Sequence, residues 1–448
     1  MPSRYAAHTM KLLPLAAALT LTATIAISAQ HPAAPSPPVI LHAAHLLDVA
    51  NARLISPGEV LVQGERIVEA GPHVTHPAGA QVIDLGDNTL MPGLIDAHVH
   101  LFLHPGNEAF QTVEESVPQR TLLAAAAAKA DLLAGFTAER DMGTEGAGCA
   151  DVAVRDAINH GLIPGPRMRV SCNAIDINGG HEDTSGLNPQ EHLLSNADRA
   201  NTADEVIAVM REQHKQGADF TKIYESGRDK LSFPEDADRN DLTQAIFTTP
   251  YQYTREQLTE AVHEADRTGS RIGVHCTGEP GAGFAAAAGV ASIDHAYSLS
   301  PDTMRSMYLK HIYAVPTFAI SEYFGQHADT ADRSQTINGE LAFHAAQFKL
   351  QLAAKVPFAV GSDVGPFPHG TQAREYELMV KYGMSPADTL KAGLLNGAIL
   401  LDWADQIGQL LPNFYADIIA VPGNPLENIS VLTHPTFVMK NGQVIRKD

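Results

Sequence analysis

The stretch Leu90–Leu101, LMPGLIDAHVHL, is an apolar, strand-like run that ends in two histidines separated by one residue. Side chains two positions apart in a strand lie on the same face, so His98 and His100 can bind one ion together. Neutral imidazole is the commonest protein ligand for zinc-like metals. The alternative is a pair of surface histidines, because the chain has 21 histidines. The sequence downstream favours the metal site.

The composition is that of a globular enzyme. With 448 residues, 44% hydrophobic and 18% charged, the chain can bury a large core, and we expect one large domain and a smaller one. The net charge of -20 is spread along the chain, which argues against nucleic acid or an anionic membrane surface as a partner. The charge favours solubility and says little about mechanism.

Residues 1–29 have the pattern of a secretory signal peptide. Arg4 and Lys11 precede the apolar run Leu12–Ile27, which small residues up to Ala29 follow. A membrane anchor is the alternative, but the run is shorter than the roughly twenty residues of a spanning helix. We expect cleavage near Ala29 and export to the periplasm or the medium, with residues 30–38 as a Pro- and Ala-rich linker.

The three cysteines, Cys149, Cys172 and Cys276, are an odd number at wide spacing. They do not have the pattern of a disulfide framework, although export would permit one bond. Cys276 follows His275 and could be a thiolate ligand, but we expect a small buried core residue.

The pattern of apolar and helical segments along the sequence predicts two kinds of structure. Short apolar runs in 39–89 and 408–448, with an Asn441-Gly442 hairpin signal, predict a small β-sandwich formed by both ends of the chain. Within 90–407, eight strand-like runs each precede a helical one, which is the pattern of a (β/α)8 TIM barrel. The alternative, a doubly wound sheet, would normally have a Gly-rich turn where this chain has His-x-His.

Polar residues end several of the barrel runs, and the carboxyl ends of barrel strands meet at one face. Besides the first pair of histidines, these residues are Lys222, His275, His295 and Asp363, at the ends of the fourth, fifth, sixth and eighth runs. A single histidine at a strand end is commonly a core or surface group. The ordered series favours a shared site.

The same residues lie in motifs that resemble the amidohydrolase superfamily, in the branch of imidazolonepropionase-like and Xaa-Pro carboxypeptidase (prolidase) enzymes that includes ochratoxin-hydrolysing members. The matching strings are PGLIDAHVHL, GFTAERD, ADFTKIYESG, VHCTG, SIDHAYSL, AVGSDVGPFPHG and IGQLLPNFYADIIAVPGNPL. The resemblance implies two zinc ions, one bound by His98 and His100 and the other by His275 and His295. It also implies a bridging carbamate on Lys222, contact of Asp363 with the first metal, and a homo-oligomer, for which an octamer is one candidate.

The chemistry of these groups is consistent. A lysine buried among positive ions is shifted towards its neutral form, and the amine can then take up carbon dioxide as a carbamate. The alternative for Lys222 is an ordinary buried lysine paired with Glu225. Asp363 is the expected general base, and its alternative is a helix N-cap. The ligand types suit zinc, although manganese, cobalt or iron fit similar sites.

Four further residues are candidates for contact with a substrate. His181 could donate to the substrate carbonyl or oxyanion, whereas Tyr224 and Arg228 could bind a substrate carboxylate. His369 could border the pocket. As loop residues, His181 and Arg228 could equally be solvated. The connection 227–250 is long and charged, which is typical of a lid or a specificity insert.

These expectations combine into one predicted reaction. A metal-activated hydroxide would hydrolyse the amide bond to a C-terminal amino acid, in an N-acyl amino acid or a dipeptide, and ochratoxin A is one such substrate. An alternative within the same superfamily is a cyclic amide or lactone hydrolase. A third interpretation is a periplasmic binding protein without catalysis. The complete set of predicted metal ligands, with a proton shuttle at Asp363, argues against it.

Overall fold

The structure is a computed structural model that describes residues 37–183, 188, 190, 193–232, 236 and 246–448. Pro37–Asp448 is one compact unit. The predicted signal peptide, nearly all of the predicted linker and the centre of the 227–250 connection lie outside the described residues. The domain boundaries at 89/90 and 407/408 stay a prediction. Among the described helices, none has both the length and the apolar character needed to cross a bilayer.

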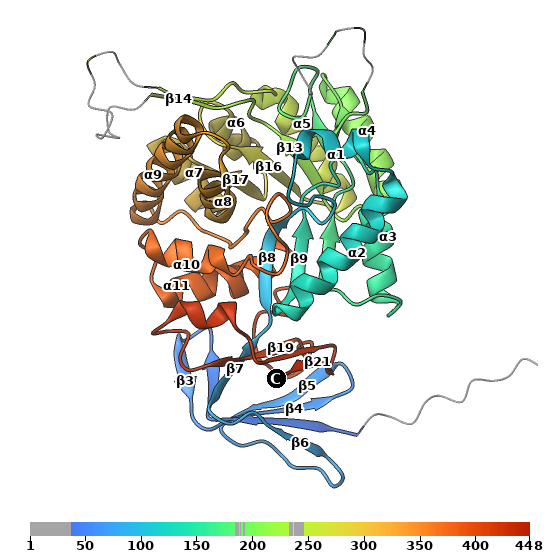
Figure 1. Cartoon of the computed structure of the whole chain (residues 1–448), viewed down its shortest axis with the longest axis vertical. Helices are drawn as coiled ribbons and strands as arrows, with labels where there is room; N and C mark the ends of the chain where they lie inside the picture. Colours follow the sequence, from blue (N-terminus) through green and yellow to red (C-terminus); the bar gives the residue numbers. More distant parts are fainter. Residues whose placement is uncertain (1–36, 184–187, 189, 191–192, 233–235, 237–245) are drawn as a thin grey trace, which may run out of the picture. The chain divides into compact units, whose positions relative to one another are not determined.

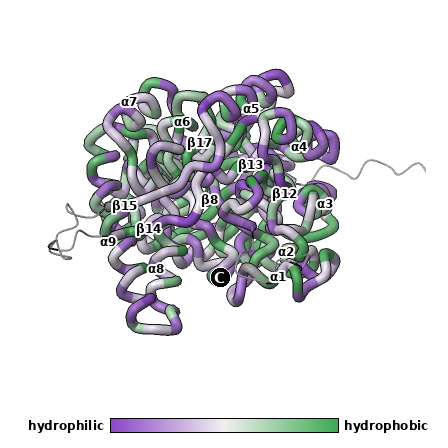
Figure 2. The backbone as a smooth tube through the Cα atoms, turned by 90° about the horizontal axis from the view of Figure 1, so that it is seen from above, coloured by the Kyte–Doolittle hydropathy of each residue, from purple (hydrophilic) through white to green (hydrophobic). Residues whose placement is uncertain are grey.

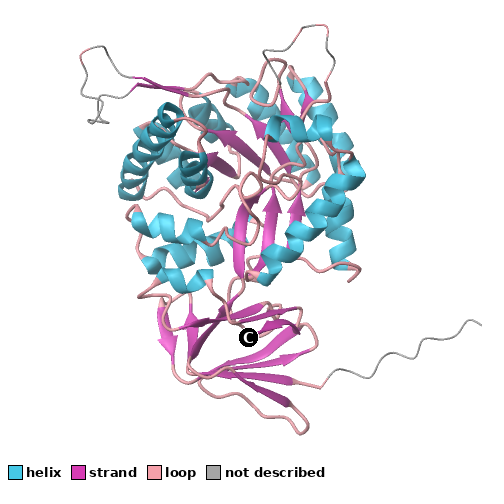
Figure 3. Ribbon diagram, viewed as in Figure 1, coloured by secondary structure: helices cyan, strands magenta, loops and turns pink. Residues whose placement is uncertain are grey.

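The central part of the chain is a barrel of parallel strands surrounded by helices (Figures 1 and 3). The strands are β8 (Leu94–Val99), β9 (Phe136–Asp141), β10 (Arg167–Val170), β11 (Ala174–Asp176), β13 (Thr221–Tyr224), β16 (Ile272–Cys276), β17 (Ser292–His295) and β18 (Tyr313–Val315). Two sheets run in the orders β10-β9-β8 and β12-β11-β13-β16-β17-β18, where β12 is Ala197–Arg199. All six residues of β8 are buried, which is typical of a parallel strand covered on both faces.

The segment 357–364 closes the barrel between β18 and β8. The Ala97 N–H donates to the Val360 carbonyl (2.9 Å), and the Ala359 N–H donates to the Ala314 carbonyl (3.0 Å). A doubly wound open sheet is therefore wrong. The last of the eight expected strand-like runs, 358–365, is an irregular segment with isolated bridges, and Asp363 within it has a left-handed φ of 62°.

Helices surround the strands when the barrel is viewed from above (Figure 2). The helices are α1 (Glu108–Glu114), α2 (Val117–Leu133), α3 (Ala150–Asn159), α4 (Ala203–Gln216), α5 (Arg255–Thr268), α6 (Gly281–Ala288), α7 (Pro301–Lys310), α8 (Phe318–His327), α9 (Ala331–Ala353), α10 (Arg374–Lys381), α11 (Pro386–Lys391) and α12 (Gly397–Leu400), with a π-helix at Ala392–Asn396 and a 3-10 helix at Ile429–Thr433. Local sequence sets their ends: α5 begins with a capping box of Thr254 and Gln257 and ends at left-handed Gly269.

Strands from both ends of the described chain share one sheet beside the barrel. A four-stranded sheet has the order β5-β4-β1-β6 and a six-stranded sheet the order β21-β20-β19-β7-β2-β3. Their bounds are β1 (Val39–Ala43), β2 (His45–Asp48), β3 (Arg53–Ile55), β4 (Gly58–Gln63), β5 (Arg66–Gly71), β6 (Gln81–Asp84), β7 (Asn88–Pro92), β19 (Ile418–Pro422), β20 (Phe437–Lys440) and β21 (Gln443–Lys447). The predicted hairpin at Asn441 joins β20 to β21. Because β7 pairs with β19 and leads directly into β8, this sheet anchors the first barrel strand.

The cysteines form one disulfide, between Cys149 and Cys172. The bond connects the start of α3 to the break between β10 and β11. Cys276 is a buried free thiol that donates to the Gly278 carbonyl (3.4 Å), so it is a core residue. One disulfide is consistent with the expectation that an exported chain could form one such bond.

Gly361 allows the closing segment to lie flush against β8. A Cβ at this position would come within 2.8 Å of His98 Cβ and 2.9 Å of the His98 backbone nitrogen. We expect Gly361→Ala to lower the free energy of unfolding by about 1–3 kcal/mol through overpacking. Denaturant unfolding measures this change. Gly339→Ala in α9 is the control, because a Cβ there meets nothing within 4 Å, and it should stabilise by up to about 1 kcal/mol. If Gly361→Ala and Gly339→Ala changed the free energy of unfolding equally, the tight packing of residue 361 against His98 would be contradicted.

An ion pair connects α2 to the loop after the closing segment. The His369 Nδ1–H donates to Asp131 Oδ2 (2.8 Å), and both side chains are buried. Burial lowers the pKa of His369, but the charge and hydrogen bond of Asp131 outweigh it, so the net pKa is raised. A raised folded pKa gives stability that is complete below the unfolded pKa and is lost as the pH rises through the folded value.

We therefore expect the stability difference between the wild type and His369→Gln to shrink as the pH rises from about 6 to about 9. Urea unfolding at several pH values measures it. Asp131→Asn should remove most of the pH dependence of the difference. A difference that stays constant over this range would show that the pair does not contribute in this way.

Candidate metal centre

His98, His100 and Asp363 meet at the carboxyl end of β8. The Nε2 atoms of the two histidines lie 3.3 Å apart, and each lies 3.4 Å from Asp363 Oδ1. Buried Asp96 fixes this arrangement, because its Oδ1 accepts from the backbone N–H groups of His98 and Ser362 (3.0 Å each). The alternation of side chains predicted for His98 and His100 therefore produces a shared site.

His275 and His295 end the neighbouring strands β16 and β17. Their ring centroids lie 4.3 Å apart, and the His295 ring lies 5.1 Å from the His98 ring. His295 has a φ of 73°, and its Nδ1 lies 2.7 Å from the Thr317 hydroxyl, which fixes the ring. Left-handed backbone is uncommon outside glycine and is found at functional sites.

Lys222 in β13 is completely buried, and its Nζ has no hydrogen-bond partner. The alternative pairing with Glu225 is not formed, because Glu225 instead accepts from the Tyr253 N–H (3.1 Å). The N-cap alternative for Asp363 is also wrong, since the next helix, α10, has Ala373 at its N-cap. Lys222 therefore does not form the alternative ion pair, and Asp363 is not the alternative helix N-cap.

Burial shifts the pKa values of the four clustered histidines, Lys222 and Asp363. It holds the pKa values of His98, His275 and His295 well below their usual range and lowers that of His100 to about 3, with help from neighbouring positive groups. Burial also lowers the pKa of Lys222 and raises that of Asp363 to about 7. Neutral imidazoles are the form that binds metal.

The described residues fit a metal ion. His98, His295 and Asp363 offer ligand atoms that all lie within 4.8 Å of one another. The buried His275 Nε2 and Lys222 Nζ have no hydrogen-bond partner, and an unsatisfied buried polar atom normally indicates an absent ligand, water or ion. The five nitrogen and oxygen donors suit a divalent transition metal.

His181 and Tyr224 lie beside this cluster. The His181 ring is 4.2 Å from the His275 ring and stacks on Tyr224 at 5.0 Å. Its Nδ1 is buried and has no hydrogen-bond partner. The Tyr224 hydroxyl donates to Glu145 Oε1 (3.1 Å), which differs from the expected contact with a substrate carboxylate.

The other two predicted substrate contacts, Arg228 and His369, have different surroundings. Arg228 is exposed at the start of the 227–250 connection, which contains the hairpin of β14 (Lys230–Ser232) and β15 (Ile246–Thr248). His369 is 8% exposed and bound to Asp131. Their contact with a substrate stays a prediction.

Sequence reasoning missed the carboxylates that surround the ligands. Asp294 Oδ2 lies 3.2 Å from His98 Nδ1 and forms a buried ion pair with Arg140. Glu145 Oε1 lies 3.4 Å from His100 Nδ1. Carboxylates behind ligating histidines fix their orientation. For Asp294 the signal was present, because it directly precedes His295 in the motif SIDHAYSL.

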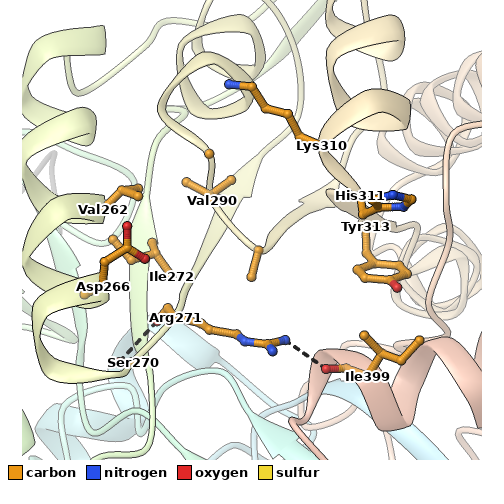
Figure 4. Close-up of a pocket in the computed structure, with 13 residues that line it drawn as sticks. Val262, Asp266, Ser270, Arg271, Ile272, Val290, Lys310, His311, Tyr313 and Ile399 are labelled. Atoms are coloured by element: carbon orange, nitrogen blue, oxygen red, sulfur yellow. Dashed lines mark hydrogen bonds between the residues drawn. The ribbon is translucent and has the colours of Figure 1, made fainter. Parts of the chain in front are cut away.

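A separate cavity of about 350 Å³ lies at the opposite end of the barrel (Figure 4). Its lining includes Arg271, Ala291 and Tyr313, which lie at the amino ends of β16, β17 and β18. Arg271 donates across it to the Ile399 carbonyl (2.8 Å). No predicted site residue lines this cavity, so it is distinct from the metal-ligand cluster.

Comparison with known proteins gives relatives for nearly the whole described chain. The chain is 29% identical to ochratoxinase of Aspergillus niger over 387 residues, which is 80% of this chain and 75% of that protein. It is similar to the structure of a Xaa-Pro dipeptidase with bound methionine in the active site, with 28% identity and a TM-score of 0.80, over 91% of this chain and 100% of that one. The structure of A. niger ochratoxinase matches in fold at 24% identity, with a TM-score of 0.77 and coverage of 92% and 96%.

The family model agrees with the motifs and the barrel. It spans residues 89–445, which contain every residue of the candidate metal centre. The chain therefore belongs to the amidohydrolase family, as the motifs around His98, Lys222 and Asp363 predicted, and it has prolidase-like and ochratoxinase-like relatives.

Proposed function

We propose that the protein is a binuclear metal-dependent amidohydrolase that cleaves the amide bond to a C-terminal amino acid. The observation that carries the proposal is the cluster of His98, His100, His275, His295 and Asp363 at the ends of neighbouring barrel strands, together with the buried, unpartnered Lys222 amine of β13. His98 and His100 would hold one ion, His275 and His295 the other, and Asp363 would contact the first.

Lys222 would bridge the two ions as a carbamate. Its amine is buried and its pKa is lowered by burial, so the nucleophilic neutral form is favoured. Carbon dioxide adds to this amine, the nitrogen loses one proton, and the product is an anion with two oxygens. Zinc is the proposed metal, because imidazole and carboxylate ligands suit it.

When bound, the two ions would lower the pKa of a water molecule towards neutrality and polarise the scissile carbonyl. Asp363 accepts the proton of the attacking water and donates it to the leaving nitrogen, which an amide requires because an unprotonated amine leaves poorly. His181 donates to the oxygen of the tetrahedral intermediate. Its place beside His275, with one buried ring nitrogen unpartnered, supports this role.

The relatives support the substrate class. Ochratoxinase and a Xaa-Pro dipeptidase are named for amide substrates that end in an amino acid, and both are similar to this chain over most of its length. Ochratoxin A, an amide of phenylalanine, and dipeptides or N-acyl amino acids are therefore the proposed substrates. Arg228 would bind the substrate carboxylate from the exposed start of its loop, and Tyr224 and His369 would border the pocket.

We further propose export and assembly into a homo-oligomer, such as an octamer. The disulfide between Cys149 and Cys172 supports an oxidising location, the periplasm or the medium. We also propose that the two flanking sheets form a composite β-sandwich. Apolar residues of both sheets, including Leu41, Val60, Leu90 and Ile418, form one buried cluster that supports this arrangement.

A hydrolysis screen of the purified, metal-analysed protein tests the proposal. N-acyl-Phe, N-acyl-Pro, X-Pro dipeptides and ochratoxin A are compared with lactones and hydantoin-like rings. We expect cleavage of the first group only, with release of the C-terminal amino acid. Asp363→Asn should lower kcat at least about 100-fold because it removes the proton acceptor.

Two results of this screen would contradict the proposal. Turnover confined to the rings would establish a cyclic amide or lactone hydrolase instead. An unchanged kcat in the Asp363→Asn enzyme would show that Asp363 does not carry out the proposed proton transfer.

A further inference from the structure

The loop that carries His181 is bound by a side chain from a distant segment of the chain. The His181 backbone N–H donates to Gln252 Oε1 (2.8 Å), and Gln252 Nε2 donates to the Tyr224 carbonyl (2.7 Å). The rings of His181 and Tyr224 stack 5.0 Å apart, with 8° between their planes. One amide side chain therefore binds the backbones of both stacked residues.

A third hydrogen bond connects Gln252 to the end of β11. Gln252 Nε2 also donates to Asp176 Oδ1 (2.5 Å), and Asp176 Oδ2 accepts from the Glu182 N–H (2.7 Å). The loop is therefore bound at His181 by Gln252, and at the next residue by a carboxylate that Gln252 contacts. Gln252 meets two acceptors and one donor, a set that an amide in this orientation satisfies completely.

Backbone pairing fixes Gln252 itself. Its N–H donates to the Glu225 carbonyl (2.8 Å), directly after β13. Ser226 and Tyr251 form an isolated antiparallel bridge next to this bond. Because the chain that enters the 227–250 connection pairs here with the chain that leaves it, Gln252 is held against the end of β13.

The His181 ring has no close hydrogen bond of its own. Its Nδ1 is buried without a partner, and its Nε2 lies 3.6 Å from Glu182 Oε1, which is too far for a hydrogen bond. The backbone of His181 and the stacking on Tyr224 therefore set the place of the ring. Gln252 acts on both, because it binds the His181 N–H and the Tyr224 carbonyl.

We propose that Gln252 is a positioning residue for His181: its hydrogen bonds hold the His181 ring in place beside His275. This inference rests on the proposed function, in which His181 donates to the oxygen of the tetrahedral intermediate. Such a donor is effective only when it is held in place before the reaction, because its contribution depends on its distance from the developing charge. Gln252 supplies that support without touching the substrate.

Substitution of Gln252 and His181, singly and together, tests this role. The metal-loaded enzymes are compared on whichever of N-acyl-Phe, N-acyl-Pro, X-Pro dipeptides and ochratoxin A the wild type cleaves fastest. His181→Ala should lower kcat roughly 100-fold, as the loss of one oxyanion donor does. Gln252→Ala should lower kcat roughly tenfold, because the donor is present but misplaced. In the His181→Ala enzyme, the same change should lower kcat less than about twofold, because no donor remains to be positioned.

A nearby glutamine provides the matched control. Gln257 accepts from the Thr254 N–H (2.9 Å) and donates to the Asn201 carbonyl (3.1 Å), so its hydrogen bonds serve the start of α5 alone. Gln257→Ala should lower Tm through the lost capping box and leave kcat unchanged. This comparison separates a loss of stability from a loss of positioning.

Hydrogen exchange of the holoenzyme gives a readout that does not need activity. The His181 amide, which donates to Gln252, should exchange faster in Gln252→Ala than in the wild type. Gln257→Ala should leave this exchange unchanged. Mass spectrometry of the peptide that contains residue 181 measures both.

The outcomes separate this inference from the proposed function. An undiminished kcat in Gln252→Ala, a tenfold loss that persists in the His181→Ala enzyme, or unchanged exchange of the His181 amide would overturn the positioning role and leave the amidohydrolase standing. Failure of the wild type to cleave any substrate of the screen would contradict the proposed function, and the part of Gln252 in catalysis with it.

Discussion

The structure depends on an uncompensated buried amine at the centre of the barrel mouth. Lys222 has no hydrogen-bond partner, although an isolated charge at a buried position costs more than most single interactions supply. Its neighbours are imidazoles whose pKa values burial also lowers. A buried amine without a partner, among buried imidazoles, is unfavourable in a core that binds no ion, and it fits a site that binds metal. The barrel, the flanking sheet and the strained residues serve to hold these groups together.

The support of the centre is distributed over distant parts of the chain. Asp96 ties the closing segment to β8, and Asp294 connects His98 to Arg140. The sheet shared by β7 and β19 holds the start of β8. His295 and Asp363, two of the candidate ligands, have left-handed backbone. These contacts would preorganise the candidate site, because few groups would have to move when an ion binds.

Much of this was predictable from the sequence. The eight-fold alternation predicted the barrel, and the strand ends predicted which of its residues meet, because parallel strands bring their carboxyl ends to one face. The irregular closing segment was not predictable, since it depends on the close contact of Gly361 with His98. Glu145 and Gln252 were missed because their contacts with His100 and His181 arise from loop geometry, which has no periodic signal.

Anomalous diffraction from crystals of the metal-loaded protein, recorded at the absorption edge of the bound metal, would locate the ions. We predict two peaks, one beside His98, His100 and Asp363 and one beside His275 and His295, with added density on Lys222 Nζ between them. Peaks elsewhere, or a free Lys222 amine with no metal beside it, would contradict this prediction.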